Sequence, residues 1–112
     1  MANQSGVDSV RVYRLDKFIV PHTAREEFLA RVKSIHSLLK TQPGFIQDFL
    51  LEQPIDERHF SLATLVEWQD QRSIAAARAE VKAEYDKTGF NPQQAMERLG
   101  ITMELGNYTS VR

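Results

Sequence analysis

Four stretches of this chain are rich in apolar, β-branched and aromatic residues and have the length of buried strands. They span residues 10–20, 45–53, 59–68 and 101–111. The first three do not alternate cleanly between apolar and polar residues, so each presents apolar side chains on both faces of a sheet. Pro21 ends the first strand, because proline has no amide proton to donate. We expect the last strand to bend or bulge at Gly106-Asn107.

The residues between the first two strands repeat their apolar positions at helical spacing. We expect this helix to begin at Thr23, because Thr23 and Glu26 have the spacing of a capping box. Pro43-Gly44 stops it near Gln42. Its buried stripe comprises Phe28, Val32, Ile35 and Leu39, widened by Leu29 and Leu38.

A second helix follows the third strand. Asp70 is its expected N-cap and Gly89 its end, and Asn91-Pro92 starts a short helix that Gly100 closes. The inner line of the second helix comprises Ile74, Ala77 or Arg78, Val81 and Tyr85. The polar residues 54–58 are few enough to connect the second and third strands as a hairpin.

This order of elements, β-α-β-β-α-β, predicts a ferredoxin-like α+β fold, in which helices cover one face of an antiparallel sheet. Two helices cannot also cover the second face, which is apolar as well. An apolar face that the chain leaves uncovered calls for a partner. We therefore expect a homodimer that packs sheet against sheet.

The length of 112 residues and the composition are those of one globular domain. We expect the domain to occupy residues 10–112 and to follow a flexible N-terminal segment, residues 1–9. The 14 basic and 15 acidic residues are interleaved and give a net charge of −1, which disfavours nucleic acid and anionic membranes as partners. With no apolar h-region and no apolar run of ~20 residues, the expected location is cytoplasmic.

Three local features of the sequence resemble the antibiotic-biosynthesis monooxygenase family of dimeric α+β barrels. The first is Phe18-Ile19-Val20-Pro21 followed by a helix that contains Phe28, and the second is Pro43-Gly44-Phe45. The third is Glu67-Trp68 followed by Asp70 and an alanine-rich helix. Together they cover about residues 10–111. The resemblance implies a fold of this kind and an activity that needs neither flavin nor metal.

Enzymes of this family oxidise phenols, quinols or polyketide-like rings directly with O2, and related members degrade haem. Such a site must hold a planar apolar substrate, host a base and stabilise negative charge. The asparagine that haem-degrading relatives use in strand one aligns, through Pro21, with Leu15. Their second-helix aromatic aligns, through Trp68, with Ala77. The histidine of quinol-oxidising relatives aligns with Ala77 or Arg78. Of the residues that the family uses, only Trp68 is present at the matching position in this chain. We therefore expect no haem degradation.

The candidate catalytic residues are His36, Trp68 and Arg78. His36 lies beside the apolar stripe, where it is either a base that faces the sheet or an ordinary surface histidine. Trp68 either walls a pocket or simply packs. Arg78 either holds a substrate oxyanion or extends into solvent. The candidate substrate-binding residues are Tyr13, Arg14, Phe28, Val32 and Tyr85.

Arg14 and Asp16 share one strand face and form either an ion pair at the dimer interface or the polar wall of a pocket. The chain has no cysteine and its three histidines are far apart, so we expect neither thiolate chemistry nor a metal site. Two functions remain: a cofactor-independent monooxygenase, or a non-catalytic dimeric barrel that binds a small apolar ligand or serves in assembly. A titratable group inside the pocket favours the first.

Overall fold

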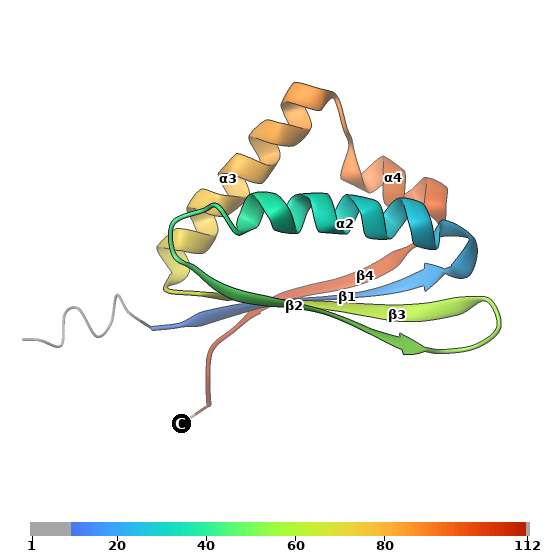
Figure 1. Cartoon of the computed structure of the whole chain (residues 1–112), viewed down its shortest axis with the longest axis horizontal. Helices are drawn as coiled ribbons and strands as arrows, with labels where there is room; N and C mark the ends of the chain where they lie inside the picture. The colour runs from blue at the N-terminus through green and yellow to red at the C-terminus, as the bar shows by residue number, and fades with distance from the viewer. Residues whose placement is uncertain (1–9, 112) are drawn as a thin grey trace, which may run out of the picture.

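The computed structural model describes residues 10–111, so the predicted flexible segment, residues 1–9, lies outside the described part. Four strands form one sheet, and all the helices lie on one of its faces (Figure 1). The elements in chain order are β1 (Val12–Pro21), the 3-10 helix η1 (His22–Ala24), α2 (Arg25–Leu39), β2 (Phe45–Pro54), β3 (His59–Trp68), α3 (Gln71–Thr88), α4 (Pro92–Leu99) and β4 (Thr102–Tyr108).

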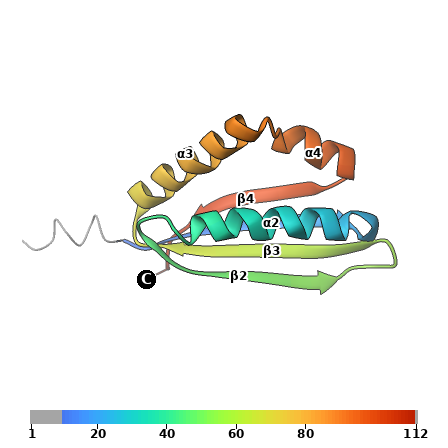
Figure 2. The same cartoon turned by 45° about the horizontal axis from the view of Figure 1, so that its top comes forward.

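The sheet has the strand order β2-β3-β1-β4, with every neighbouring pair antiparallel. This is the ferredoxin-like arrangement, so the predicted fold class is confirmed. The third strand has the bounds that the sequence predicts, and the others differ by a few residues at their ends. α4 follows α3 end to end and lies over the end of the sheet from which β4 starts (Figure 2).

Side chains and glycines fix the ends of α3 and α4 as predicted. Asp70 accepts a hydrogen bond from the amide of Ser73 at 2.8 Å, and Asn91 caps α4 in the same way. Gly89 ends α3 with φ of +73°, a left-handed conformation that suits glycine.

The capping box predicted at Thr23 does not form. Thr23 lies inside η1, and the N-cap of α2 is Ala24, whose side chain makes no capping hydrogen bond. The reason is that β1 continues through Pro21 and the chain turns first through η1. The His22 amide meanwhile donates to the Arg58 carbonyl at 2.7 Å, which fixes the start of η1 against the β2–β3 hairpin.

The bulge predicted at Gly106-Asn107 is also absent, because β1 and β4 keep an unbroken register from Ile19 opposite Thr102 to Tyr13 opposite Tyr108. Gly106 instead leaves room for an aromatic ring: a Cβ there would lie 3.0 Å from Cε1 of Tyr108. The bulge of this sheet lies in β2, between Phe45 and Gln47.

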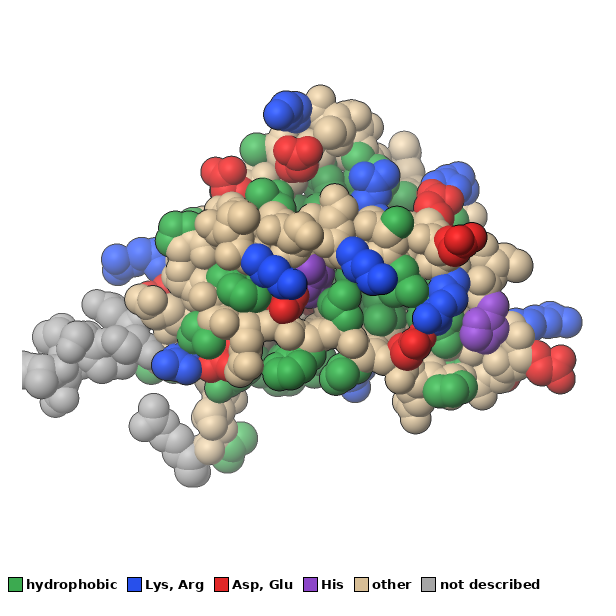
Figure 3. All heavy atoms as spheres, viewed as in Figure 1, with side chains coloured by type: hydrophobic (Ala, Val, Ile, Leu, Met, Phe, Trp, Pro, Cys, Tyr) green, Lys and Arg blue, Asp and Glu red, His purple; other side chains and the backbone are tan. Residues whose placement is uncertain are grey.

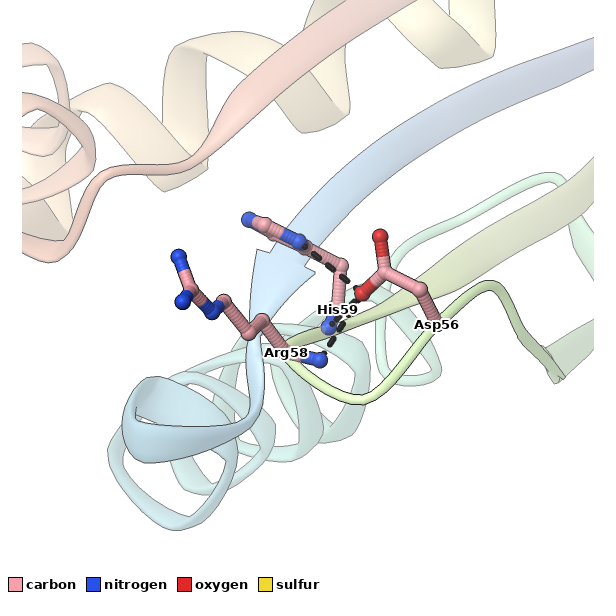
Figure 4. A network of polar contacts seen from close by, with 3 residues as sticks. All are labelled: Asp56, Arg58 and His59. Carbon is pink, nitrogen blue, oxygen red and sulfur yellow. Dashed lines mark hydrogen bonds and ion pairs between the residues drawn. The ribbon is translucent and has the colours of Figure 1, made fainter.

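The turn between β2 and β3 is organised by one carboxylate. Asp56 accepts hydrogen bonds from the amides of Arg58 and His59, each at 2.8 Å, and its Oδ1 lies 3.2 Å from Nδ1 of His59 (Figure 4). The bond from the Arg58 amide is the largest cause that lowers the pKa of Asp56. The polar loop therefore works as the predicted hairpin turn.

The two faces of the sheet have different surroundings. The helix-covered face, called here the cavity face, carries two buried clusters: one around Phe28 and Phe60, and one around Trp68 and Ile74. The opposite face, called here the open face, has no helix over it (Figure 1). The open face carries Tyr13, Leu15, Ile19, Phe49, Leu51, Leu65, Glu67 and Tyr108. Hydrophobic side chains also reach the surface along the lower margin in Figure 3.

Candidate functional site

A cavity of about 450 Å³ lies between the cavity face and the helices. β1 and β3 supply its floor, and α2, α3 and α4 its walls. Met103 and Leu105 of β4 face the helices, yet they remain about half exposed, at 48% and 50%. These two side chains stay exposed because α3 and α4 arch away from α2, which leaves β4 uncovered in the gap between α2 and the other two helices (Figure 2). An apolar floor that is open to water is a suitable site for an apolar ligand.

His36 enters this cavity from α2 and is 7% exposed. Its Nδ1 lies 2.8 Å from Oδ2 of Asp48 on β2. Lys40, the C-cap of α2, brings its ammonium to 4.0 Å from the other oxygen of Asp48. No side chain in the described part of the chain bonds Nε2 of His36, so this nitrogen is the one left for a ligand.

The bulge in β2 is what turns Asp48 toward His36. Phe45 pairs with Trp68 and faces the helices, and the extra residue Ile46 then shifts the alternation by one. Asp48 consequently faces the cavity side, whereas Phe49 faces the open face. In an unbulged strand the carboxylate would point away from α2, and His36 would be buried without this partner.

A second ionisable pair lies on β1. Arg14 donates from Nε to Oδ1 of Asp16 at 2.6 Å and from Nη1 to Oδ1 of Asn107 at 3.3 Å. Burial raises the pKa of Asp16, although the charges of Arg14 and His36 act in the opposite direction. Of the two roles predicted for this pair, the structure favours the polar wall of a pocket over an ion pair at the dimer interface, because both side chains line the cavity.

Trp68 closes one end of the cavity and is 3% exposed. Its ring meets that of Phe45 edge to face, with the ring centroids 5.8 Å apart. It also packs in the cluster that contains Ile74 and Ala77 of α3. Trp68 therefore packs in the core and also lines the cavity, and its role toward a substrate stays a prediction.

Aromatic and cationic groups line the outer part of the cavity. The Arg31 guanidinium lies 3.7 Å from the ring centroid of Phe90, whose centroid is in turn 5.1 Å from that of Tyr85. Burial raises the pKa of Tyr85, so its hydroxyl is a proton donor at neutral pH. Arg78 reaches the cavity from the exposed side of α3.

Most of the predicted site residues come together in this cavity, which is lined by His36, Trp68, Arg78, Arg14, Phe28, Val32 and Tyr85. Tyr13 is the exception, and placing it there was wrong. Successive residues of β1 alternate between the faces, so Tyr13 lies on the open face opposite Glu67. The catalytic roles of the other residues stay predictions.

Sequence reasoning missed Asp48 and Arg31. The bulge hides Asp48, because a regular alternation from Phe45 would have assigned it to the other face. Arg31 lies next to Val32 of the apolar stripe, and only the position of Phe90 reveals that its guanidinium is held at the cavity. Leu15 lies on the open face, so the cavity-facing residues of β1 in this region are Arg14 and Asp16.

No three His, Cys, Asp or Glu side chains among residues 10–111 lie close enough to hold a metal ion. No helix within that range is long and apolar enough to cross a membrane.

The chain belongs to the antibiotic biosynthesis monooxygenase family, whose family model matches residues 11–84. Among solved structures it is similar to SnoaB, a cofactor-independent oxygenase from Streptomyces nogalater, with 24% identity and a TM-score of 0.66 over 92% of this chain and 95% of that chain. No curated protein matches the sequence.

Two more distant structures share the fold. An MhuD variant with two manganese protoporphyrin IX molecules bound per active site is 22% identical, with a TM-score of 0.62 over 90% of this chain and 95% of that chain. A dimeric ferredoxin-like protein from an uncultured marine organism is 12% identical, with a TM-score of 0.63 over 92% and 97% of the two chains. At such identities the likeness establishes the fold.

Proposed function

We propose that this protein is a cofactor-independent monooxygenase that oxidises a small electron-rich aromatic compound, such as a phenol, a quinol or a polyketide-like ring, with O2. Family membership and the similarity to SnoaB support this proposal. The observation that carries it is the His36–Asp48 pair, a titratable group with a fixed orientation inside a largely apolar cavity.

The proposed reaction begins with a proton transfer. Nε2 of His36 takes the proton of a ring hydroxyl, and Asp48, bonded to Nδ1, fixes the tautomer and stabilises the imidazolium that forms. Asp48 is thus a positioning residue and His36 the base. The resulting anion is a much stronger reductant than the neutral ring, so it can pass electrons to O2.

The electrons and atoms balance without a further reductant. A quinol gives up four electrons in all and reduces one O2; one oxygen atom enters the ring, and the other leaves as water with two hydrogens from the substrate. Arg14, which lines the cavity beside Asp16, stabilises the ring oxygen while it is anionic. Trp68 supplies a flat apolar wall against which the ring packs.

The proposal includes a homodimer that packs through the open face. Ile19, Phe49 and Leu51 are 40%, 45% and 55% exposed on this face, and no helix of the described chain covers them. A second copy would bury them. The dimer should bury at least ~1,200 Å² in total, the lower limit for stable interfaces.

Oxygen uptake tests the function. Purified protein is mixed with a panel of quinols and phenols in the presence of a chelator, and O2 consumption is followed with an electrode. We expect at least one substrate to consume O2 in a one-to-one ratio and, with ¹⁸O2, to retain one labelled atom. If ring compounds bind but none consumes O2 above the rate without protein, the protein is instead the non-catalytic ligand-binding barrel.

A further inference from the structure

Residues 78–94 form an arch over the cavity that is anchored at its two ends. The arch comprises the second half of α3, the connection to α4 and the first turn of α4, and it rises away from the sheet (Figure 2). Ala77 before it and Ala95 after it are buried, whereas no residue between them is. Segments with few buried contacts open at a low free energy while the rest of a protein stays folded.

The side chains that hold the arch down are those that line the cavity. Val81, Tyr85 and Phe90 are half-buried, and all three belong to the cavity lining. Every other residue of the arch is exposed. α2 is different, because its buried residues recur once per turn. The arch therefore rests on the cavity, where α2 rests on the sheet, and lifting the arch exposes little buried apolar surface.

One contact joins the arch to the opposite wall of the cavity. Arg31 on α2 places its guanidinium 3.7 Å from the ring centroid of Phe90, which lies between α3 and α4. This stack bridges the gap between α2 and the arch. The ion pair of Glu27 with Arg98 lies beyond Ala95, so it fixes the base of the arch and not its span. A cation–π contact is weak enough to break and re-form in the folded protein.

We propose that residues 78–94 are a lid, which opens as one unit while the rest of the chain stays folded and so admits an aromatic molecule to the cavity. The stack of Arg31 on Phe90 is its latch. Gly89 lets the lid change direction between the two helices, because it has a φ of +73° and a Cβ there would meet open space. The lid does not depend on the oxygenase chemistry, since a ligand of a non-catalytic barrel would enter by the same route.

Amide hydrogen exchange, followed residue by residue by NMR, tests whether the lid opens as a unit. The protection factors of the helical amides 79–88 should share one value, at least ~10²-fold below that of the amides of α2. A segment that opens together gives one common value, whereas simple fraying gives protection that falls steadily toward Thr88. Such a gradient, or protection equal to that of α2, would overturn the proposal.

Matched arginine variants test the latch. Arg31→Gln should make the lid amides exchange at least ~2-fold faster, the lower end of what a cation–π contact contributes. Arg25→Gln makes the same change on α2, but the Arg25 guanidinium lies 4.8 Å from the ring centroid of Phe60 on β3, so lid exchange should not change. The double variant Arg31→Gln, Phe90→Leu should exchange no faster than Phe90→Leu alone, because both substitutions remove one contact. No effect of Arg31→Gln, or an equal effect of Arg25→Gln, would mean that this stack is not the latch.

A single introduced cysteine tests whether the lid controls entry. The chain has no cysteine of its own, so Val66→Cys, in the cavity lining on β3, reports alone. The uncharged aromatic disulfide 4,4′-dithiodipyridine reacts with the new thiol and releases 4-thiopyridone, which is followed by absorbance. Adding Arg31→Gln should speed this reaction by the same factor as lid exchange, and adding Arg25→Gln should not.

A second cysteine position controls for global unfolding. Val20→Cys lies in the core but outside the cavity lining, so it should react at least ~10²-fold more slowly than Val66→Cys. Equal rates at the two positions would mean that the reagent reaches both through global unfolding. A rate at Val66→Cys that Arg31→Gln leaves unchanged would show that entry does not depend on the latch. Either result would overturn the lid as the route into the cavity.

Discussion

Two carboxylates, Asp16 and Glu67, lie on strands that pair directly, and each is bonded to an arginine, yet they differ in the direction of their pKa shift. Burial raises the pKa of Asp16 on the cavity face despite the contact with Arg14. Hydrogen bonds from Gln47 and then Arg11 lower the pKa of Glu67 on the open face. On the cavity face, burial destabilises the charged form of Asp16, which is typical of reactive sites. On the open face, hydrogen bonds stabilise the charged form of Glu67.

The largest expected difference between the faces concerns catalysis. His36→Ala should lower turnover of any substrate found by the oxygen panel by at least ~10²-fold, because it removes the proposed base. His59→Ala removes a histidine from the β2–β3 hairpin, outside the cavity, and should leave turnover unchanged. Both variants should keep the circular dichroism spectrum of the parent. Full activity of His36→Ala would place the base elsewhere.

The next expected effect concerns association. Phe49→Lys puts a charge into the middle of the proposed interface and should weaken the dimer by roughly 10²-fold or more, because an unpaired charge cannot be buried there. Met103→Lys makes the same change on the cavity face, at a side chain of similar exposure, and should leave the dimer intact. Light scattering behind a sizing column measures both. A monomer mass for the unmodified protein at micromolar concentration would exclude the dimer.

The contrast between the faces was only partly predictable from the sequence. The sequential order of strands and helices, the hairpin and the caps at Asp70, Gly89 and Asn91 depend on local signals, and the structure contains them. The face of β1 that carries Arg14 followed from alternation alone. The expectation that Tyr13 binds the substrate was wrong, because the same alternation places Tyr13 opposite Glu67 on the open face.

Asp48 shows why the rest of the site could not be predicted. The direction of the Asp48 side chain depends on the bulge at Ile46. Position 46 is neither glycine nor proline, so the residue type there does not predict a bulge. Gly106 did suggest a bulge, but that prediction was wrong, because the glycine leaves space for the Tyr108 ring instead. Local residue types predict elements well, but a one-residue shift in pairing depends on how the whole strand packs.

The smallest expected effects have opposite signs on the two faces. Asp16→Asn should leave the protein as stable or slightly more stable at neutral pH, because the folded state holds the charged form of Asp16 at a cost. Glu67→Gln should make it less stable, because the folded state favours the charged form of Glu67. Each difference should stay below about 1 kcal/mol, since water partly screens both ion pairs.

Acid should remove both differences. The raised pKa of Asp16 means that its cost is present above that pKa and disappears as the pH falls below the ordinary value of 3.8. The lowered pKa of Glu67 means that its stabilisation is present above the ordinary value of 4.5 and is lost as the pH falls through the folded pKa. Urea unfolding of the three proteins at one concentration, from pH 7 down to pH 3, measures this. Shifts of the same sign at pH 7 would mean that the two carboxylates lie in equivalent surroundings, and the cavity would then lose its case as a reactive site.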